Sequence, residues 1–304
     1  MNKLGIVGAG KWGSTIATRI HETGIASISI VYDKDIERAR LLAEKVGAAV
    51  ARDLGDFDKH RDLLGIIVAT SIDSLAHVSA ELIKMGFNVL IEKPVAESLD
   101  KVRMLRNLAE SRRVVAMPGF IVRFDPISVW IKNRLSRDKE SPEDLYILRL
   151  SRRPPWAKAN SIILDLAIHD IDLARYLIDS DIDPVSWSIH NLEIDQAFTM
   201  YAKHRGGSVF INVDGVSKNK VRKVIISLTK SYLEGDYVNQ YIISKSEGSE
   251  YEHLKIKGTE ALVKEITAFI DKCRGADVAE APTLLDAEKA HEIINRVFSR
   301  KNHY

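Results

Sequence analysis

The sequence predicts an α/β protein of two domains, the first with a doubly wound parallel sheet and the second with a mainly antiparallel or mixed sheet. The length of 304 residues is about twice that of an average domain of roughly 150 residues. Strand-like and helical segments alternate over the first hundred residues, which is typical of a parallel sheet with right-handed crossovers. The alternation weakens after residue 120, and several β-like runs then follow without helices between them. We therefore expect domains at 1–119 and 120–304.

The elements of the first domain follow from apolar runs and the residues that end them. Leu4–Val7 is a short apolar strand, and β-branched residues favour a second strand at Ser27–Tyr32. Gly24 and Gly86 each follow a helical pattern and are expected to end it. In chain order we expect strands at 4–7, 27–32, 63–69, 88–91 and 114–117, and helices at 14–23 and 75–85.

The second half is expected to begin with a helix at 127–135 and a strand at 145–150. The segment 151–159 carries two arginines and two prolines, which indicates a loop, and a long helix is expected at 161–178. Further strands are expected at 185–190, 197–201, 208–213, 221–229, 232–235 and 237–245, and final helices at about 259–273 and 283–299.

Composition and charge exclude several classes of function. The 44 basic and 42 acidic residues leave a net charge of +2, without the basic excess of a nucleic-acid-binding domain. Cys273 is the single cysteine, which excludes an internal disulfide framework and a cysteine-based metal cluster. No apolar run approaches the roughly 18 residues of a membrane span, and strand-like sequence begins directly after Lys3. We therefore expect a cytoplasmic protein with no nucleic-acid or membrane partner.

A glycine motif after the first strand predicts a dinucleotide site. Gly8, Gly10 and Gly13 form Gly-x-Gly-x-x-Gly between a strand and a helix, and Asp33 follows the last glycine by 20 residues. Gly8 permits the tight turn, Gly10 lets the backbone approach a pyrophosphate, and Gly13 allows close packing of helix on strand. The helix N-terminus favours phosphate, and Asp33 suits the hydroxyls of the adenine ribose.

The cofactor is expected to be NAD, although Lys34 and Arg38 also offer partners for the 2′-phosphate of NADP. Gly8, Asp33, Thr70 and Glu92 all follow strands, and ligands of doubly wound sheets bind beyond the carboxyl ends of the strands. The expected cofactor-binding residues are Gly8, Gly10, Lys11, Trp12, Gly13, Asp33, Lys34, Arg38, Thr70, Ser71 and Glu92.

The helix expected at 161–178 carries polar residues on a largely apolar background. On a regular helix Asp165, His169 and Asp172 fall within a sector of roughly 60°. Buried carboxylates and an imidazole are costly unless they pair, bind a metal or line a binding site. Three interpretations stay open: a structural polar cluster, a divalent metal site, and general acid–base catalysis by His169 with Asp165 positioning it. No second group of ligands supports the metal.

Glu92-Lys93-Pro94 favours the catalytic interpretation. A lysine at the exit of a strand beside a nicotinamide can polarise an alcohol or carbonyl oxygen. The alternative is a surface lysine before a turn proline.

These motifs, with Gly119–Pro126 and the segment Gly258–Leu262 before a helix containing Phe269, occur in an order and spacing that resembles the Gfo/Idh/MocA oxidoreductases. That family includes glucose–fructose oxidoreductase and inositol dehydrogenase. Asp165–Asp172, Arg123-Phe124-x-Pro126 and Val213–Ser227 look most like the branch that acts at C3 of UDP-N-acetylglucosamine or its uronate.

The resemblance implies a Rossmann domain followed by an α/β domain whose open sheet packs against a partner subunit, as a homodimer or homotetramer. It implies catalytic roles for Lys93, Asp165 and His169. Two departures stand out: Leu75 occupies the position of a usual family histidine, with His77 offset by two residues, and Ile121 replaces a frequent asparagine.

The expected reaction is oxidation of a secondary sugar alcohol by NAD, with His169 accepting the hydroxyl proton and Lys93 holding the reacting oxygen. The loop 152–158 is a candidate substrate gate, in which arginines suit a diphosphate and an aromatic ring suits a sugar or uracil. The expected substrate-binding residues are Lys93, Arg123, Arg153, Trp156, Asp165 and His169. The alternatives are a free aldose or polyol dehydrogenase, a non-catalytic dinucleotide sensor and, more remotely, a metal-dependent hydrolase.

Overall fold

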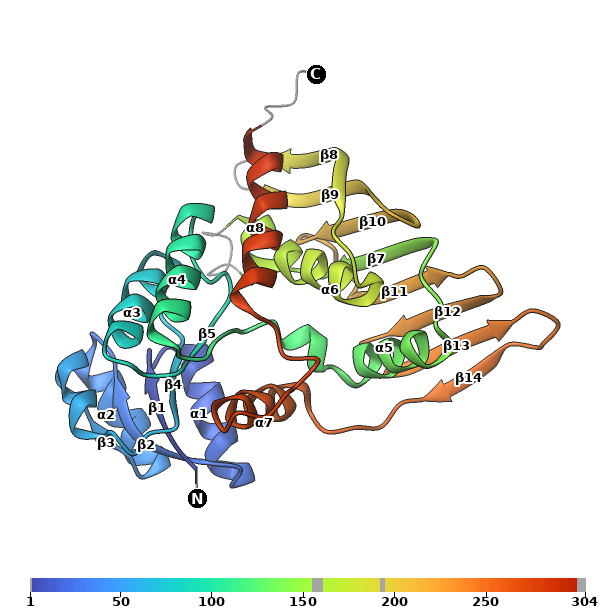
Figure 1. Cartoon of the computed structure of the whole chain (residues 1–304). Helices are drawn as coiled ribbons and strands as arrows, with labels where there is room; N and C mark the ends of the chain where they lie inside the picture. Colours follow the sequence, from blue (N-terminus) through green and yellow to red (C-terminus); the bar gives the residue numbers. More distant parts are fainter. Residues whose placement is uncertain (1, 155–160, 192–194, 300–304) are drawn as a thin grey trace. The chain divides into compact units, whose positions relative to one another are not determined.

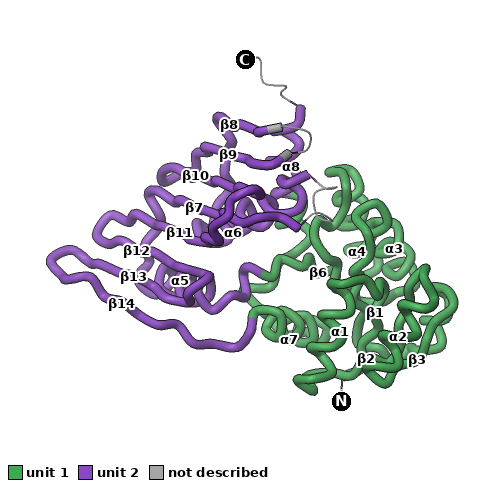
Figure 2. Tube along the Cα trace, turned by 180° about the vertical axis from the view of Figure 1, so that it is seen from behind, with its two compact units in different colours: residues 1–121, 261–288 green, residues 122–260, 289–304 purple. Residues whose placement is uncertain are grey.

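The structure is a computed structural model that describes residues 2–154, 161–191 and 195–299. It divides into two compact units, shown in green and purple in Figure 2. Unit 1 contains Met1–Ile121 and Ala261–Glu288, and unit 2 contains Val122–Glu260 and Lys289–Tyr304. The sequence predicts a single boundary after Gly119. In the structure, residues 261–288 also belong to the N-terminal unit.

Unit 1 contains a six-stranded parallel sheet in the order β3-β2-β1-β4-β5-β6 (Figure 1). Strand order reverses at β1, which pairs with β2 on one side and β4 on the other. This is the doubly wound arrangement that the sequence predicts, and its ligand-binding edge lies beyond the carboxyl ends of β1 and β4. The strands are β1 (Lys3–Val7), β2 (Ser27–Tyr32), β3 (Ala49–Val50), β4 (Gly65–Val68), β5 (Val89–Ile91) and β6 (Ala116–Pro118).

The helices of unit 1 form two packed groups, with α1 against α2 and α7, and α3 against α4. They are α1 (Lys11–Thr23), α2 (Ile36–Val46), α3 (Ile72–Lys84), α4 (Leu99–Arg112) and α7 (Ala261–Cys273), with a short 3-10 helix η1 at Leu54–Lys59. Local capping explains several boundaries. Gly24 ends α1 in the left-handed conformation, and the Asp35 carboxylate accepts hydrogen bonds from the first turn of α2.

Close packing fixes α7 within unit 1. The Phe269 ring lies against Gly65 at the start of β4, where an added Cβ would come within 2.5 Å of a ring atom. Phe269 is fully buried, and Leu262 and Ile266 on the same helix are buried as well. The apolar face of α7 therefore completes the core of the parallel sheet domain.

Unit 2 contains an eight-stranded sheet in the order β14-β13-β12-β11-β7-β10-β9-β8. Every neighbouring pair is antiparallel except β7 and β10, so the sheet is mainly antiparallel, as predicted. The strands are β7 (Asp144–Leu150), β8 (Asp183–Asn191), β9 (Asp195–His204), β10 (Gly207–Asp214), β11 (Val221–Ser227), β12 (Ser231–Asp236), β13 (Tyr241–Ser246) and β14 (Glu252–Lys255). The sequence did not indicate β14, whose side chains are all exposed.

Helices cover one face of this sheet (Figure 1). The helix α5 (Pro126–Asp138) packs against β12, and α6 (Ile168–Ile178) packs against β7 and β10. A 3-10 helix, η2 (Ile121–Phe124), precedes α5, and a π-helical segment, η4 (Ile163–Ala167), leads into α6. Side chains alternate between the two faces, so that Leu145 and Ile147 are buried under the helices while Tyr146 is on the opposite face.

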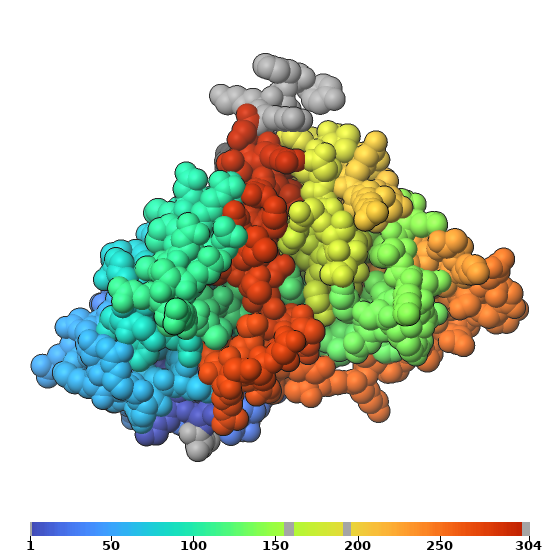
Figure 3. Space-filling view, in the orientation of Figure 1, coloured from blue at the N-terminus to red at the C-terminus, as the bar shows by residue number. Residues whose placement is uncertain are grey.

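The last helix, α8 (Leu284–Ser299), follows α7 in the chain. In the part that belongs to unit 2, Lys289 and Arg296 form ion pairs with Asp181 and Asp183 at the start of β8. Figure 3 shows this end of α8, in red, lying against the yellow surface of β8. The ion pairs are consistent with that contact and attach the end of α8 to the edge of the sheet.

Candidate active site

The glycine loop has the geometry that its motif predicts. Gly8 has φ of +103°, and an added Cβ there would lie 2.4 Å from the carbonyl oxygen of Ala69. An added Cβ at Gly13 would lie 1.9 Å from the oxygen of Gly8, so α1 crosses β1 too closely for any side chain. Nothing lies within 4 Å of an added Cβ at Gly10, where α1 begins. The space beside Gly10 is therefore open to a ligand at the N-terminus of α1.

Asp33 is half-buried and holds the same loop. One carboxylate oxygen accepts a hydrogen bond from the backbone N–H of Ala9 at 2.6 Å, and the other accepts one from Asp35 at 2.9 Å. Of the two candidate partners for a 2′-phosphate, Arg38 forms an ion pair with Asp35 at 3.1 Å, and Lys34 is exposed. The acidic residue is thus placed at the end of β2, next to the glycine loop.

Thr70 and Ser71 lie between β4 and α3, with Ser71 at the N-cap of α3. The neighbouring Ala69 donates its backbone N–H to Val7 at 2.8 Å, which extends the pairing of β4 with β1. Leu75, at the position of the family histidine, is 1% exposed and belongs to the core, whereas His77 is exposed on α3. The offset by two residues therefore turns the two side chains to different faces of the helix.

Glu92 contacts two other predicted site residues, Trp12 and Lys93, at the end of β5. One carboxylate oxygen accepts a hydrogen bond from the indole N–H of Trp12 at 2.5 Å, and the other accepts one from the backbone N–H of Lys93 at 3.2 Å. Glu92 is 7% exposed, and an added Cβ at Gly119 would lie 3.2 Å from its carboxylate. Burial raises the pKa of Glu92 against the opposing effects of Trp12 and Lys93.

In unit 2, the segment expected as one helix at 161–178 begins with the π-helical η4 and continues as α6. Asp165 lies within η4 and is half-buried, and His169 lies in the first turn of α6 with 7% exposure. A π-helical turn changes the angle between residues before and after it, so the sector of roughly 60° derived from a regular helix does not apply. Such turns occur frequently at functional sites.

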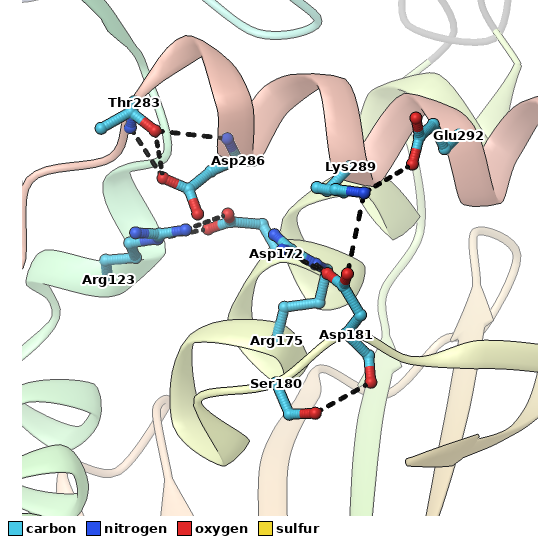
Figure 4. Close-up of polar contacts among 9 residues, drawn as sticks. All are labelled: Arg123, Asp172, Arg175, Ser180, Asp181, Thr283, Asp286, Lys289 and Glu292. Carbon is cyan, nitrogen blue, oxygen red and sulfur yellow. Dashed lines mark hydrogen bonds and ion pairs between the residues drawn. The ribbon is translucent and has the colours of Figure 1, made fainter. Parts of the chain in front are cut away.

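Each carboxylate near His169 has an arginine partner. Asp165 pairs with Arg153 at 3.1 Å, and Asp170 accepts a hydrogen bond from Arg149 at 2.7 Å. Asp172 accepts two hydrogen bonds from Arg123, at 2.6 and 2.8 Å (Figure 4). Asp172 is therefore part of a buried structural ion pair, which corrects its grouping with Asp165 and His169. The described residues contain no group of three or more His, Cys, Asp or Glu side chains that could hold a metal ion.

Two further expectations concern substrate contacts. Arg123 and Arg153 are 4% and 5% exposed, and their guanidinium groups contact Asp172 and Asp165 of the same unit. Arg123 also stacks on the Tyr176 ring, with its guanidinium carbon 4.9 Å from the ring centroid. Both arginines are expected from the sequence to contact substrate. In the structure their guanidinium groups contact carboxylates of the same unit. Trp156 lies outside the described residues.

The candidate residues fall into two sets. Unit 1 brings together the glycine loop, Asp33, Trp12, Glu92 and Lys93, and unit 2 contains Asp165 and His169. Sequence reasoning missed Glu265, a fully buried acidic residue on α7 in unit 1. The sequence pattern that could have revealed it is a charged residue flanked at helical spacing by Leu262 and Phe269 on an apolar face.

No described helix is both long and apolar enough to cross a membrane.

Residues 2–120 match the model of the Gfo/Idh/MocA family, described as an oxidoreductase family with an NAD-binding Rossmann fold. The match covers the N-terminal part of the chain and agrees with the resemblance to this family that the motifs carry. Inositol 2-dehydrogenase of Rubrobacter xylanophilus is 30% identical over 186 residues, which is 60% of this chain. The matched region spans 54% of that relative, about half of its length.

Another relative is similar over nearly its whole length. UDP-N-acetylglucosamine 3-dehydrogenase of Acidithiobacillus ferrooxidans is 23% identical over 305 residues, covering 96% of this chain and 94% of the relative. Its solved structure has a TM-score of 0.88 over 97% of this chain and 96% of its own, at 20% identity. Levoglucosan dehydrogenase, solved with NADH and L-sorbose, has a TM-score of 0.88 at 14% identity and covers 98% of this chain and 96% of its own. Both units of the chain therefore have the fold of these two dehydrogenases.

Proposed function

We propose that this chain is an NAD-dependent dehydrogenase that oxidises a secondary alcohol of a sugar. The observation that carries the proposal is the arrangement at the end of β5. There Glu92 holds both Trp12, from the glycine loop, and the backbone of Lys93. This arrangement supports a role for the Lys93 ammonium group at the edge of the sheet that also carries the dinucleotide loop. NAD, when bound, accepts the hydride that leaves the alcohol carbon.

The residues of the chain would handle the proton and the oxygen. Nδ1 of His169 is buried, so Nε2 is the nitrogen left to accept the hydroxyl proton of a substrate. Lys93 would donate a hydrogen bond to the reacting oxygen and stabilise the negative charge that develops on it. Asp165, next to Arg153, would orient the histidine or the substrate.

For the substrate we propose a nucleotide sugar such as UDP-N-acetylglucosamine, oxidised at C3. The support is the similarity over 94% of the Acidithiobacillus ferrooxidans enzyme, against 54% of the inositol dehydrogenase. Asp33 supports NAD over NADP because its carboxylate lies beside the glycine loop, where it would repel a 2′-phosphate. Arg153 would then act on the site indirectly, by holding the carboxylate of Asp165. Arg123 would act indirectly as well, by holding Asp172 on the helix that carries His169.

The test is a panel of sugars with NAD and NADP, followed by absorbance at 340 nm. We expect rapid turnover of UDP-N-acetylglucosamine or its uronate with NAD and weak turnover of free sugars. Rapid turnover of inositol or a free aldose, with no turnover of nucleotide sugars, would contradict the proposed substrate but not the proposed reaction. Dinucleotide binding without turnover of any alcohol would favour the sensor.

The catalytic roles are tested by His169→Ala and Lys93→Ala. Each change should lower kcat by roughly 10²–10⁴, because a positioned proton acceptor and an oxygen-stabilising charge act mainly in the transition state. NAD affinity, measured by calorimetry, should change little. Exposed residues of the same types, His77→Ala and Lys84→Ala on α3, are the matched controls. Near-normal turnover in both site variants would contradict the assigned roles.

A further inference from the structure

Arg222 is a half-buried arginine near the start of β11 that the proposed reaction does not use. Its guanidinium lies over the Tyr237 ring, with the guanidinium carbon 5.1 Å from the ring centroid. The backbone N–H of Tyr237 also donates to the carbonyl oxygen of Arg222 at 2.9 Å. Tyr237 is 7% exposed, and a hydrogen bond of 2.8 Å joins its hydroxyl group to that of Ser128. Contact with a ring fixed in this way limits the orientations of the guanidinium.

The register of the sheet places Arg222 beside an arginine–aspartate pair at the start of α6. Arg222 lies directly opposite Arg149 on β7, and directly opposite residues of an antiparallel pair are on the same face of the sheet. That face is the one covered by helices, because Arg149 donates a hydrogen bond of 2.7 Å to the Asp170 carboxylate on α6. Asp170 directly follows His169 in the first turn of α6. Arg222 is therefore at the same end of unit 2 as the proposed proton acceptor.

Arg222 differs in charge balance from the other arginines that contact η4 and α6. Each of those has a carboxylate partner: Arg149 pairs with Asp170, Arg153 with Asp165 and Arg123 with Asp172. Among the described residues, the Arg222 guanidinium has neither an ion pair nor a hydrogen bond. Burial and the charge of Arg149 lower the pKa of Arg222 to about 10, so the group is still a cation at neutral pH. A half-buried cation without a counter-ion is stabilised by an anion that binds to it.

We propose that Arg222 binds an oxyanion of the substrate, a phosphate or a carboxylate group, and thereby holds the sugar beside His169. A guanidinium can form two parallel hydrogen bonds with such a group, which fixes the orientation of the molecule that carries it. Neutral sugars and polyols lack this group, so the contact favours an acidic substrate over a neutral one. The inference rests on the proposed function, because it takes His169 to mark the position of the reacting carbon.

Unfolding in urea separates this role from a structural one. Because Arg222 has no ion pair among the described residues, Arg222→Met leaves no carboxylate without its partner and keeps an apolar chain on the Tyr237 ring. We expect this variant to unfold at the same or a higher urea concentration than the wild type. Arg149→Met should unfold at a lower concentration, because Asp170 is 1% exposed and loses its partner. An equal loss of stability in both variants would make Arg222 a structural residue and overturn the proposal.

Ligand binding is measured by calorimetry in the presence of NADH, so that no sugar is oxidised. The probes are UDP, UDP-N-acetylglucosamine, its uronate and neutral N-acetylglucosamine. Arg222→Met should weaken binding of the probe that carries the recognised anion about tenfold to a hundredfold, because charge-assisted hydrogen bonds are lost. Equal weakening of UDP and both nucleotide sugars would identify a phosphate, and weakening confined to the uronate would identify a carboxylate. The affinity for N-acetylglucosamine should be the same in both proteins.

Two control variants complete the experiment. Arg222→Lys keeps the charge without the paired donors and should recover only part of the lost affinity. Lys230→Met, at an exposed position between β11 and β12, should leave every affinity unchanged. The proposal would be overturned by wild-type affinity of Arg222→Met for all anionic probes, by equal weakening of N-acetylglucosamine, or by a wild type that binds no anionic probe. A wild type that binds an anionic probe through Arg222 but oxidises no sugar would contradict the proposed function and not the anion site.

Discussion

At the scale of single residues, the glycine loop contains one glycine that helix packing requires and another that leaves room for a ligand. Gly13 has no room for a Cβ, because the oxygen of Gly8 would lie 1.9 Å away, whereas Gly10 faces open space. Both glycines belong to one motif, and these distances agree with the different roles that the motif predicts for them. Substitutions at Gly10 and Gly13 therefore test the dinucleotide site, because the Gly13 variant serves as a structural control for the Gly10 variant.

We expect Gly13→Ala to destabilise unit 1 by about 2 kcal/mol or more, because α1 must move away from β1. Gly10→Ala should leave the urea midpoint unchanged and weaken NAD binding about tenfold, or about 1.4 kcal/mol, because its methyl group occupies the approach of the pyrophosphate. Unfolding in urea and calorimetry with NAD measure the two effects. Unchanged NAD affinity in Gly10→Ala would place the phosphates elsewhere.

At the scale of elements, most strands and helices could be predicted, because apolar runs and glycine stops are local signals. The π-helical start at Ile163–Ala167 could not, since nothing in the residue types distinguishes it from an α-helical turn. That single irregularity invalidates a helical wheel drawn across it. The ion pairs of Asp165, Asp170 and Asp172 join α6 or η4 to segments between 12 and 49 residues away, and such pairings are not encoded locally.

The buried pair of Arg123 and Asp172 anchors α6 to η2 through two hydrogen bonds. We expect Arg123→Met to cost about 3–5 kcal/mol, because Asp172 is left buried and charged without a partner. The double change Arg123→Met with Asp172→Leu should recover much of this loss, since both charges are removed. Urea unfolding of the two variants measures the difference. Equal destabilisation by the single and double changes would mean that packing rather than charge dominates.

At the scale of the whole molecule, the division into units shows what linear reasoning misses. Residues Ala261–Glu288 return to unit 1, because the apolar face of α7 is completed by β4 and α1 rather than by its neighbours in sequence. Glu265 acquires its buried position on α7 in the same way. The motifs of the site could be predicted because glycine loops and strand ends are local, whereas this acid could be recognised only from the tertiary packing.

The uncovered face of the sheet in unit 2 bears on assembly. Phe210 is 37% exposed and Tyr146 is 36% exposed, and their rings stack with centroids 4.7 Å apart. Tyr201 continues this aromatic patch, with its centroid 4.9 Å from that of Phe210. Half-buried Ile225 and Ile243 lie on the same face by strand register. An exposed aromatic patch on a sheet is typical of a protein interface, and we propose that a second copy of the chain covers it.

This assembly predicts that the wild type is a dimer or tetramer by light scattering after size-exclusion chromatography. Phe210→Asp should shift it toward the monomer, because association would bury the new charge at the centre of the patch without a partner. Leu41→Asp, at a residue 69% exposed on α2, is the control and should leave the mass unchanged. Phe210 lies on the strand face opposite the buried Val209 and Ile211, so the folded monomer should keep its urea midpoint. A monomeric wild type, or a Phe210→Asp variant with the wild-type mass, would exclude this face as the interface.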